Sequence, residues 1–321
     1  MIAGGTGQIG TLLARAWHAA GDDVLVLGRR VRATPWRSAS WDAGASWRDR
    51  SALGAWASAI DGADVVVGLA GRSVDCRYTA ANRRRILDSR VDSTRALAAE
   101  IAAARRPPRV WLQASTATIY AHRYDAANDE ANGWLGGDEP GAPSTWRFSV
   151  EVARAWEAAA TATPLPATRL VLLRSAMTMH ADPGSIFAVL LRLVRCGLGG
   201  RAGDGRQFVS WIHGDDFVRA VDWLIAHDDL AGPVNLCAPE PLPFTAFMAA
   251  LRAAWGVRFG LPAARWMLEL GAFVLRTETE LVRKSRRVVP GRLLADGFRF
   301  DWPQWPTAAA DLVQRWRART P

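Results

Sequence analysis

Three regularly spaced glycines carry the clearest chemical signal in the chain. They are Gly4, Gly7 and Gly10 of the run GGTGQIG, and apolar residues at helical spacing follow them. Because glycine has no Cβ, the N–H groups of such a turn can approach a pyrophosphate closely, and the start of the next helix adds partial positive charge. The pattern predicts a dinucleotide site; a glycine-rich turn without a ligand is the alternative. The predicted cofactor contacts in this run are Gly4, Thr6, Gly7, Gln8, Ile9 and Gly10.

Two arginines indicate which dinucleotide the site prefers. Arg29 and Arg30 stand nineteen and twenty residues after Gly10. A site that prefers NAD(H) has an acidic residue near this position, which binds the ribose 2′-hydroxyl. Guanidinium groups suit the 2′-phosphate instead, so we expect NADP(H) rather than NAD(H), unless both are ordinary surface arginines. A further strand is expected to end near Trp41 and Asp42, and Asp42 is there a candidate acceptor for the adenine amino group or an ordinary loop aspartate.

The composition limits the class of protein. The chain has 321 residues, half of them hydrophobic, with 40 basic residues, 31 acidic residues and a net charge of +9. The arginines are dispersed and no apolar run is long enough to span a bilayer, so we expect neither a nucleic-acid nor a membrane partner. The charge reflects an arginine-rich composition or a preference for anionic ligands. Three cysteines in no zinc or disulfide pattern, and a glycine turn in place of a signal peptide, favour a cytoplasmic protein.

Expected strands alternate with expected helices along the chain. Strands are expected at residues 24–27, 63–70, 110–114 and 169–173, and helices at residues 80–104 and 146–162. This order predicts an α/β fold: a Rossmann-type doubly wound parallel sheet with a smaller, mainly helical C-terminal substrate domain. We assign residues 1–174 and 208–238 to the cofactor domain, and residues 175–207 and 239–321 to the substrate domain. Met1-Ile2-Ala3 alone precede the glycine turn, whereas a central strand usually has about 5–6 residues.

Several further motifs resemble those of one protein family. They are Leu69-Ala70-Gly71 at a strand end, Ser115-Thr116-Ala117-Thr118-Ile119-Tyr120, Trp156-Glu157, the glycine loop at residues 199–207, Trp211-Ile212-His213-Gly214-Asp215-Asp216 and the C-terminal signature at residues 290–300. With the glycine turn, they resemble the extended or atypical short-chain dehydrogenases/reductases, and more narrowly the YfcH-type epimerase-like subfamily. The resemblance implies a Rossmann-type domain that binds a nicotinamide nucleotide, and a smaller domain that closes over the substrate. It adds Leu69, Ala70, Gly71 and Ser115 to the expected cofactor contacts.

The chain departs from the wider family at the residues that move the proton. That family uses Tyr-x-x-x-Lys, in which the tyrosine transfers a proton, and the lysine lowers the pKa of the tyrosine and binds the cofactor ribose. Counting back from Glu157 places these roles at Ser149 and Ala153, which cannot perform them. Lys284, the only lysine, lies far along the chain, and none of the three tyrosines has a lysine four residues later. The YfcH-type subfamily commonly lacks the pair too.

The remaining candidates for catalysis are hydroxyl groups after the strand at residues 110–114. Thr116 stands where the wider family has a Ser or Thr that hydrogen-bonds the substrate oxygen; the alternative is a strand-end residue that caps the next turn. Tyr120 is a candidate substitute acid, or it packs beneath the site. His122 and Tyr124 lie on the following loop, from which they can reach the site.

Three other side chains are candidate substrate ligands. Arg174 ends a strand whose carboxyl end should face the cleft, so it binds a phosphate or carboxylate, or pairs with a core acid. Arg206 and Gln207, on the glycine loop, are expected ligands for an anionic substrate. His213 is expected to be structural, and no metal site is expected because no acidic partner stands at ligand spacing.

Two functions remain open at this stage. The first is an NADP(H)-binding oxidoreductase, or a nucleotide-sugar-epimerase-like enzyme, that acts on a small, anionic substrate. The second is a non-catalytic NADP(H)-binding sensor or interaction protein, because the usual Tyr-x-x-x-Lys pair is missing. The oligomeric state is not predicted.

Overall fold

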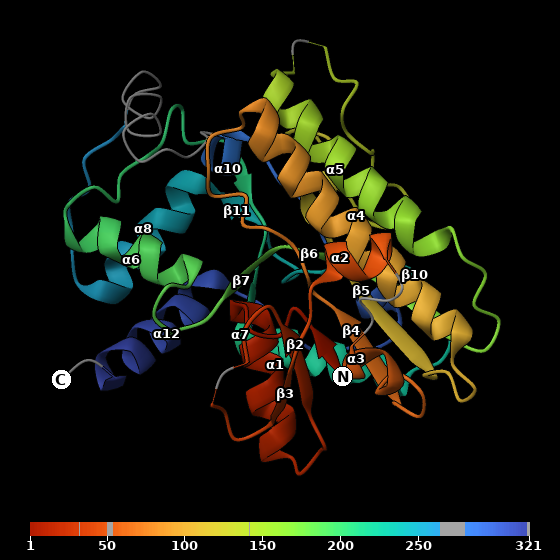
Figure 1. Cartoon of the computed structure of the whole chain (residues 1–321). Coiled ribbons are helices and arrows are strands. Elements are labelled where there is room, and N and C mark those ends of the chain that lie inside the picture. Colours follow the sequence, from red (N-terminus) through yellow and green to blue (C-terminus); the bar gives the residue numbers. More distant parts are fainter. Residues whose placement is uncertain (32, 50–53, 141, 264–279, 320–321) are drawn as a thin grey trace.

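A seven-stranded parallel sheet forms the centre of the computed structural model, which describes residues 1–31, 33–49, 54–140, 142–263 and 280–319 (Figure 1). Its strand order is β10-β6-β5-β4-β1-β2-β3, and every neighbouring pair is parallel. The order reverses between β1 and β4, so the expected Rossmann-type doubly wound fold is confirmed. The strands are β1 (Ile2–Ala3), β2 (Leu25–Gly28), β3 (Arg37–Ser40), β4 (Val65–Gly68), β5 (Val110–Thr116), β6 (Arg169–Ser175) and β10 (Gly232–Leu236).

The central strand β1 has two residues, fewer than most strands. It is held on both sides, because Ile2 pairs with Val26 of β2 and with Val67 of β4. The N–H groups of Gly4 and Gly5 then both donate to the carbonyl of Leu27, at 2.9 and 3.2 Å. The glycine turn is therefore anchored to β2 as well as to β1.

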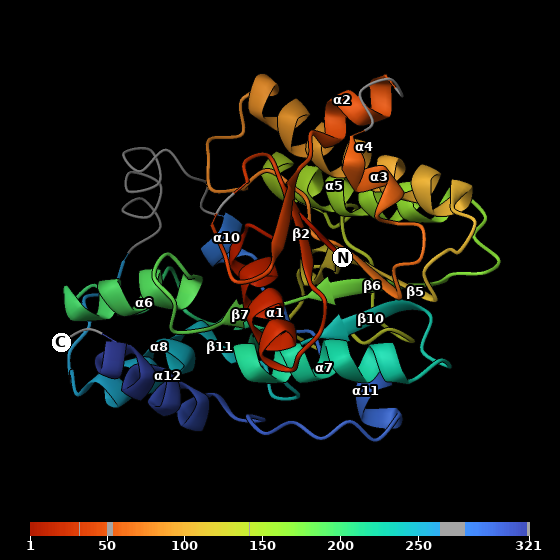
Figure 2. The same cartoon turned by 60° about the horizontal axis from the view of Figure 1, so that its bottom comes forward.

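Helices cover both faces of the sheet (Figure 2). On one face lie α1 (Gln8–Ala19) and α7 (Gly214–Ala226), whose apolar side chains include Leu13, Phe217 and Val221. On the other lie α4 (Ala80–Ala103) and α5 (Ser144–Thr161), with the shorter α2 (Ala43–Arg48) and α3 (Ala55–Ser58). Strands covered on both faces are continuous apolar runs, as residues 65–67 are.

The second half of the chain builds a further, mainly helical core. In it, α6 (Ile186–Arg195), α8 (Phe244–Trp255) and α12 (Trp305–Arg319) pack around buried aromatic side chains. Two small sheets join β7 (Met177–Met179) to β9 (Trp211–His213) and β8 (Phe208–Val209) to β11 (Leu242–Pro243). The short helices α10 (Glu280–Arg283) and α11 (Gly291–Ala295) come before α12. The division of the chain into two domains at residues 174, 207 and 238 stays a prediction.

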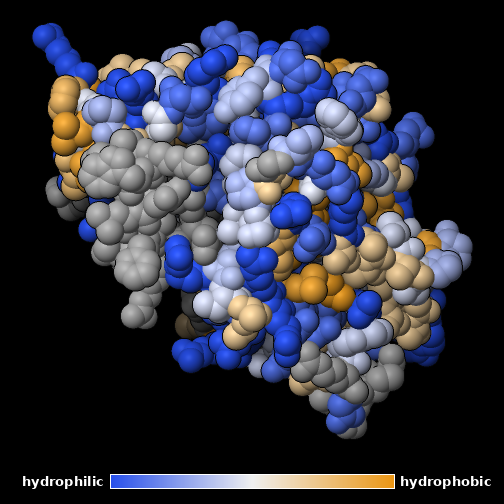
Figure 3. Space-filling model, turned by 90° about the horizontal axis from the view of Figure 1, so that it is seen from above, coloured by the Kyte–Doolittle hydropathy of each residue, from blue (hydrophilic) through white to orange (hydrophobic). Residues whose placement is uncertain are grey.

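No helix in the described part of the chain is both long and apolar enough to span a membrane. Viewed from above, hydrophilic residues surround smaller areas of hydrophobic ones on the surface of the molecule (Figure 3).

Candidate functional site

The glycine turn is tightly packed beneath and open above. Gly4 has a φ of +78°, and a Cβ there would lie 2.6 Å from the backbone nitrogen of Ala70. A Cβ on Gly10 would lie 2.3 Å from Cα of Gly5. At Gly7, by contrast, the nearest atom would be the Gly4 carbonyl oxygen at 3.6 Å, and this residue is exposed. The turn therefore needs glycine for packing at Gly4 and Gly10, and it leaves open space over Gly7.

Helix α1 begins at this space without a described side chain capping it. Its N-cap is Gly7, and the intrahelical hydrogen bonds begin with the N–H of Thr11, which donates to the Gly7 carbonyl at 2.9 Å. The N–H groups of the first turn are thus available to an anion, which the helix dipole also attracts. Gln8 is exposed, and its side-chain nitrogen donates to the Pro183 carbonyl at 3.2 Å, which ties the helix start to the loop after β7.

Arg29 and Arg30 are exposed directly after β2, beside the turn. Neither forms a hydrogen bond or ion pair with another residue that the structure describes. Thr6 lies against the same strand end, because a Cβ on Gly28 would come within 2.5 Å of its methyl group. Asp42 has a structural partner: it is the N-cap of α2 and accepts from the N–H of Ala45 at 3.1 Å.

A small cavity opens where β5 ends. Its volume is about 130 Å³, and polar side chains from four separate segments line it. Thr116 comes from the end of β5, where its hydroxyl accepts from the N–H of Thr118 at 3.1 Å and so caps the 3-10 turn η2 (Ala117–Ile119). The other polar lining residues are Tyr78, Arg90, Thr118, Ser149, Glu280 and Arg286.

The C-terminal segment supplies three ionisable groups to this cavity and its wall. The hydroxyl of Ser149 donates to Oε2 of Glu280 at 2.5 Å. Nε of Arg286 donates to the Thr118 hydroxyl at 3.0 Å, and its Nη2 lies 3.7 Å from Oε1 of Glu280. Lys284 is also buried, and its Nζ donates to the Thr118 carbonyl at 2.8 Å. The single lysine, remote in sequence, therefore lies next to the end of β5.

Burial shifts the pKa values of ionisable groups in the cavity and its wall. It lowers the pKa of Lys284 to about 8, with a further contribution from the positive charge of Arg286. Burial also raises the pKa of Tyr78 to about 12, helped by the negative charge of Glu280. Burial lowers the pKa of Arg90 to about 10. Perturbed groups that converge on a cavity are typical of functional sites.

A closed polar network lies beside the cavity and contains three of the predicted site residues. Arg174 forms a two-point ion pair with Glu157, at 2.8 Å for both Nε–Oε1 and Nη2–Oε2. Ser115 donates to Oε1 of Glu157 at 2.6 Å. Arg174 also donates to the Tyr120 hydroxyl at 2.9 Å, which donates in turn to Asn235 at 3.0 Å. Arg174 therefore pairs with a core acid and Tyr120 is buried in the same network, while the roles of both residues toward a substrate stay predictions.

The two expected substrate ligands on the glycine loop have different environments. Arg206 is exposed and its guanidinium lies over the ring of Tyr124, at 5.9 Å. Gln207 is buried, and its side-chain nitrogen donates to the Ala202 carbonyl at 3.1 Å. His122 accepts from the N–H of Ser285 at 2.7 Å, so it faces the C-terminal segment.

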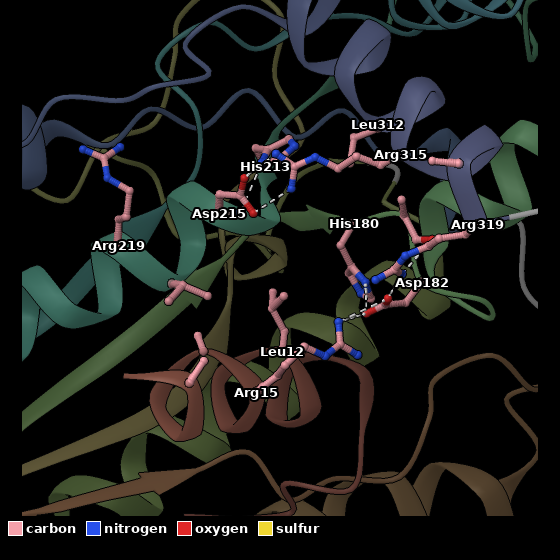
Figure 4. Close-up of a pocket in the computed structure, with 15 residues that line it drawn as sticks. Leu12, Arg15, His180, Asp182, His213, Asp215, Arg219, Leu312, Arg315 and Arg319 are labelled. Carbon is pink, nitrogen blue, oxygen red and sulfur yellow. Dashed lines mark hydrogen bonds and ion pairs between the residues drawn. The ribbon is translucent and has the colours of Figure 1, made fainter. Parts of the chain in front are cut away.

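A larger hollow of about 680 Å³ lies between α1, α7 and α12 (Figure 4). Its polar side chains bind one another: Asp182 contacts Arg15, His180 and Arg319, and Asp215 contacts Arg315. His213 caps α7 and contacts Asp311 at 3.1 Å, as a structural histidine does. Within the described residues, no three His, Cys, Asp or Glu side chains gather as a metal site.

The structure places the predicted site residues in several separate groups. The turn residues lie at the start of α1, with Ala70 against Gly4 and with Arg29 and Arg30 directly after β2. Thr116 lies in the cavity, Arg174, Tyr120 and Ser115 lie in the closed network, Asp42 caps α2, and Arg206 and Gln207 lie on the glycine loop. Sequence reasoning missed Tyr78, Glu280, Lys284 and Arg286. The one available signal was that Lys284 is the single lysine of an otherwise arginine-based chain.

Comparisons with known proteins agree with this arrangement. Residues 1–237 match the NAD dependent epimerase/dehydratase family, and residues 263–312 match a domain of unknown function, DUF1731. The chain is 29% identical over 316 residues to the human epimerase family protein SDR39U1, covering 98% of this chain and 99% of that protein. The crystal structure of human SDR39U1 (isoform 2) with NADPH matches with a TM-score of 0.82, at 27% identity and 98% coverage of both chains. A nucleoside-diphosphate sugar epimerase from Corynebacterium glutamicum matches with a TM-score of 0.72 and 25% identity, covering 97% of this chain and 57% of that one.

Proposed function

The chain belongs to the NAD dependent epimerase/dehydratase family, and on that premise we propose that it is an NADP(H)-dependent oxidoreductase of the epimerase type. It is an NAD(P)-binding, epimerase-like protein; the preference for NADP(H), the catalytic activity and the substrate are the proposal. The substrate is a small anionic molecule of the sugar-nucleotide class, and the expected location is the cytoplasm.

The packing of the glycine turn is the main observation that supports the proposal. Its underside has no room for a Cβ at Gly4 or Gly10, while the space over Gly7 and the uncapped start of α1 suit a pyrophosphate. Arg29 and Arg30 stand exposed beside this space and suit a ribose 2′-phosphate. A related human protein has been crystallised with NADPH, which supports the same preference here.

The cavity at the end of β5 is the proposed place for the reacting part of the substrate. When bound, the nicotinamide supplies hydride acceptance and donation. Thr116 orients the substrate oxygen, while the guanidinium groups of Arg90 and Arg286 make the cavity favourable for an anion. Arg206, exposed on the glycine loop, is the proposed ligand for a phosphate outside the cavity.

Cofactor preference is tested by titrating NADPH and NADH into the wild type and the double variant Arg29→Ala/Arg30→Ala, with protein fluorescence as the readout. Loss of charged hydrogen bonds worth about 1.5–3 kcal/mol should weaken NADPH binding roughly 10–150-fold. NADH binding should change less than about twofold, since that cofactor has no 2′-phosphate. The matched control is Arg84→Ala/Arg85→Ala on the exposed face of α4. Equal effects on both cofactors would contradict the assignment.

Turnover is tested with a panel of UDP-, dTDP- and GDP-hexoses. Each is incubated with the protein and NADP⁺, and product sugars are identified by proton NMR. We expect at least one sugar to be epimerised or oxidised. Binding of NADPH without turnover of any member would refute the proposed enzyme and support the non-catalytic alternative.

A further inference from the structure

Hydride chemistry at an alcohol carbon requires a group that takes and returns the hydroxyl proton. The residues at the positions of the wider family's pair are Ser149 and Ala153. A serine hydroxyl alone is a poor proton acceptor near neutral pH, because efficient acid–base catalysis needs a group whose pKa lies near the working pH. The chain therefore needs another ionisable group within reach of the cavity.

Glu280, which accepts a hydrogen bond from Ser149, is an ionisable group within reach of the cavity. The distance from the hydroxyl oxygen to Oε2 is 2.5 Å, in the range of a charge-assisted hydrogen bond between a hydroxyl and a carboxylate. Glu280 is 1% exposed, so its partners are protein groups rather than bulk water. The contact joins α5 to α10 across 131 residues of sequence.

Charged and phenolic side chains from two segments surround Glu280. Arg286 lies 3.7 Å away and compensates the negative charge, and Lys284 adds positive charge from the same segment. From the segment before α4, the phenol of Tyr78 faces Ser149 and Glu280, and its raised pKa keeps it protonated at neutral pH. Ser149, Glu280, Tyr78 and Thr116 all line the one cavity.

We propose that Glu280, acting through the hydroxyl of Ser149, is the proton acceptor and donor for the substrate hydroxyl in this cavity. The inference rests on the proposed function. In the oxidative direction the substrate hydroxyl gives its proton to Oγ of Ser149, and the serine proton passes to Oε2 of Glu280. The carbon–hydrogen bond of the substrate breaks, its electron pair leaves as hydride to NADP⁺, and a carbonyl forms. The reverse steps return the hydride and the proton, so the relay is restored after each cycle.

The test compares Glu280→Gln and Ser149→Ala with the wild type on the best sugar of the panel. Each variant should keep its NADPH affinity within about twofold and lose about 10²–10⁴-fold in kcat, the usual contribution of general acid–base catalysis. The dependence of kcat on pH should also differ between the glutamine variant and the wild type. Ser149→Thr, which keeps the hydroxyl, should retain activity. The matched control is Glu151→Gln, an exposed carboxylate on α5 that does not line the cavity.

The single lysine allows the site to be monitored without turnover. Protein labelled with [¹³Cε]lysine has one lysine signal, which should titrate near pH 8. Because the charge of Glu280 raises the pKa of Lys284, the midpoint should fall in the glutamine variant, which also shows that the site is folded.

Three results would overturn the inference. The first is a Glu280→Gln variant with the lowered lysine midpoint but wild-type kcat and pH profile. The second is a fully active Ser149→Ala variant. In both cases the proposed function would stand. The third is a wild type that binds NADPH and turns over no sugar, which would remove the proposed function and this inference together.

Discussion

Replacing Arg174 with methionine should destabilise the protein strongly. The side chains of Arg174 and Glu157 are 8% and 13% exposed, and their two contacts are both 2.8 Å. Removing one partner of a buried ion pair leaves an uncompensated charge, which typically lowers the free energy of unfolding by about 3–5 kcal/mol. The Tyr120 hydroxyl would also lose a donor. The free energy of unfolding should therefore fall by about 3–5 kcal/mol and not by less.

Urea denaturation followed by circular dichroism measures this loss. With an m-value of about 3 kcal/mol per molar urea, the midpoint should fall by roughly 1–2 M. The control is Arg37→Met, which breaks an ion pair with Asp23 of the same 2.8 Å length whose side chains are 64% and 73% exposed. An exposed pair contributes about 0–1 kcal/mol, so this variant should differ little from the wild type.

A double variant separates the charge effect from lost packing. Arg174→Met/Glu157→Leu removes both charges and should recover much of the lost stability, because apolar replacements of buried pairs are often neutral or better. Recovery should be incomplete, since Ser115 then lacks its acceptor at Glu157. If Arg174→Met lowered stability no more than Arg37→Met, the reasoning would be refuted, and a substrate-binding role of Arg174 would gain support.

Two further perturbations follow from the same structure. Between pH 8 and pH 10 the free energy of unfolding should rise by up to about 3 kcal/mol. The reason is that Lys284 has a pKa of about 8 when folded and 10.5 when unfolded, so the unfolded chain binds more protons in this range. Urea midpoints of the Lys284→Met variant should lack this rise. Gly10→Ala should lower the free energy of unfolding by about 1–3 kcal/mol, since its Cβ would lie 2.3 Å from Cα of Gly5. Gly7→Ala should instead keep the melting temperature within a few degrees and weaken NADPH binding. The opposite pattern in calorimetry and titration would contradict the proposed pyrophosphate site at the glycine turn.

Much of the fold follows from local pattern. Apolar runs such as residues 63–70 predict strands buried on both faces, and β4 lies within that run. The helix expected at residues 80–104 is α4, which begins at the N-cap Thr79 and ends before Pro107. The two-residue β1 is stable because its neighbours pair with it on both sides, although its length alone does not predict a strand.

Side-chain partners were harder to predict than the strands that carry them. Arg174 lies at the end of β6, as the sequence predicts, yet its contacts depend on where Glu157 faces along α5. A strand end specifies the edge of the sheet that a side chain occupies. It does not specify whether a neighbouring helix places an acid there. The ion pair of Arg174 with Glu157 therefore becomes visible only once the packing of α5 on β6 is known.

The tertiary structure alone brings Glu280, Lys284 and Arg286 to the cavity and its wall, because these residues are far in sequence from the other residues there. These residues lie within the matched region of unknown function, residues 263–312, while Thr116 and Ser149 lie within the epimerase/dehydratase region. Their contacts, from Ser149 to Glu280 and from Lys284 and Arg286 to Thr118, join the two regions at the cavity. The cofactor turn is complete within the first region, whereas the cavity is complete only when the second is folded against it. The C-terminal segment thus brings ionisable side chains to a cavity that begins at the end of β5, and the proposed proton relay depends on this packing.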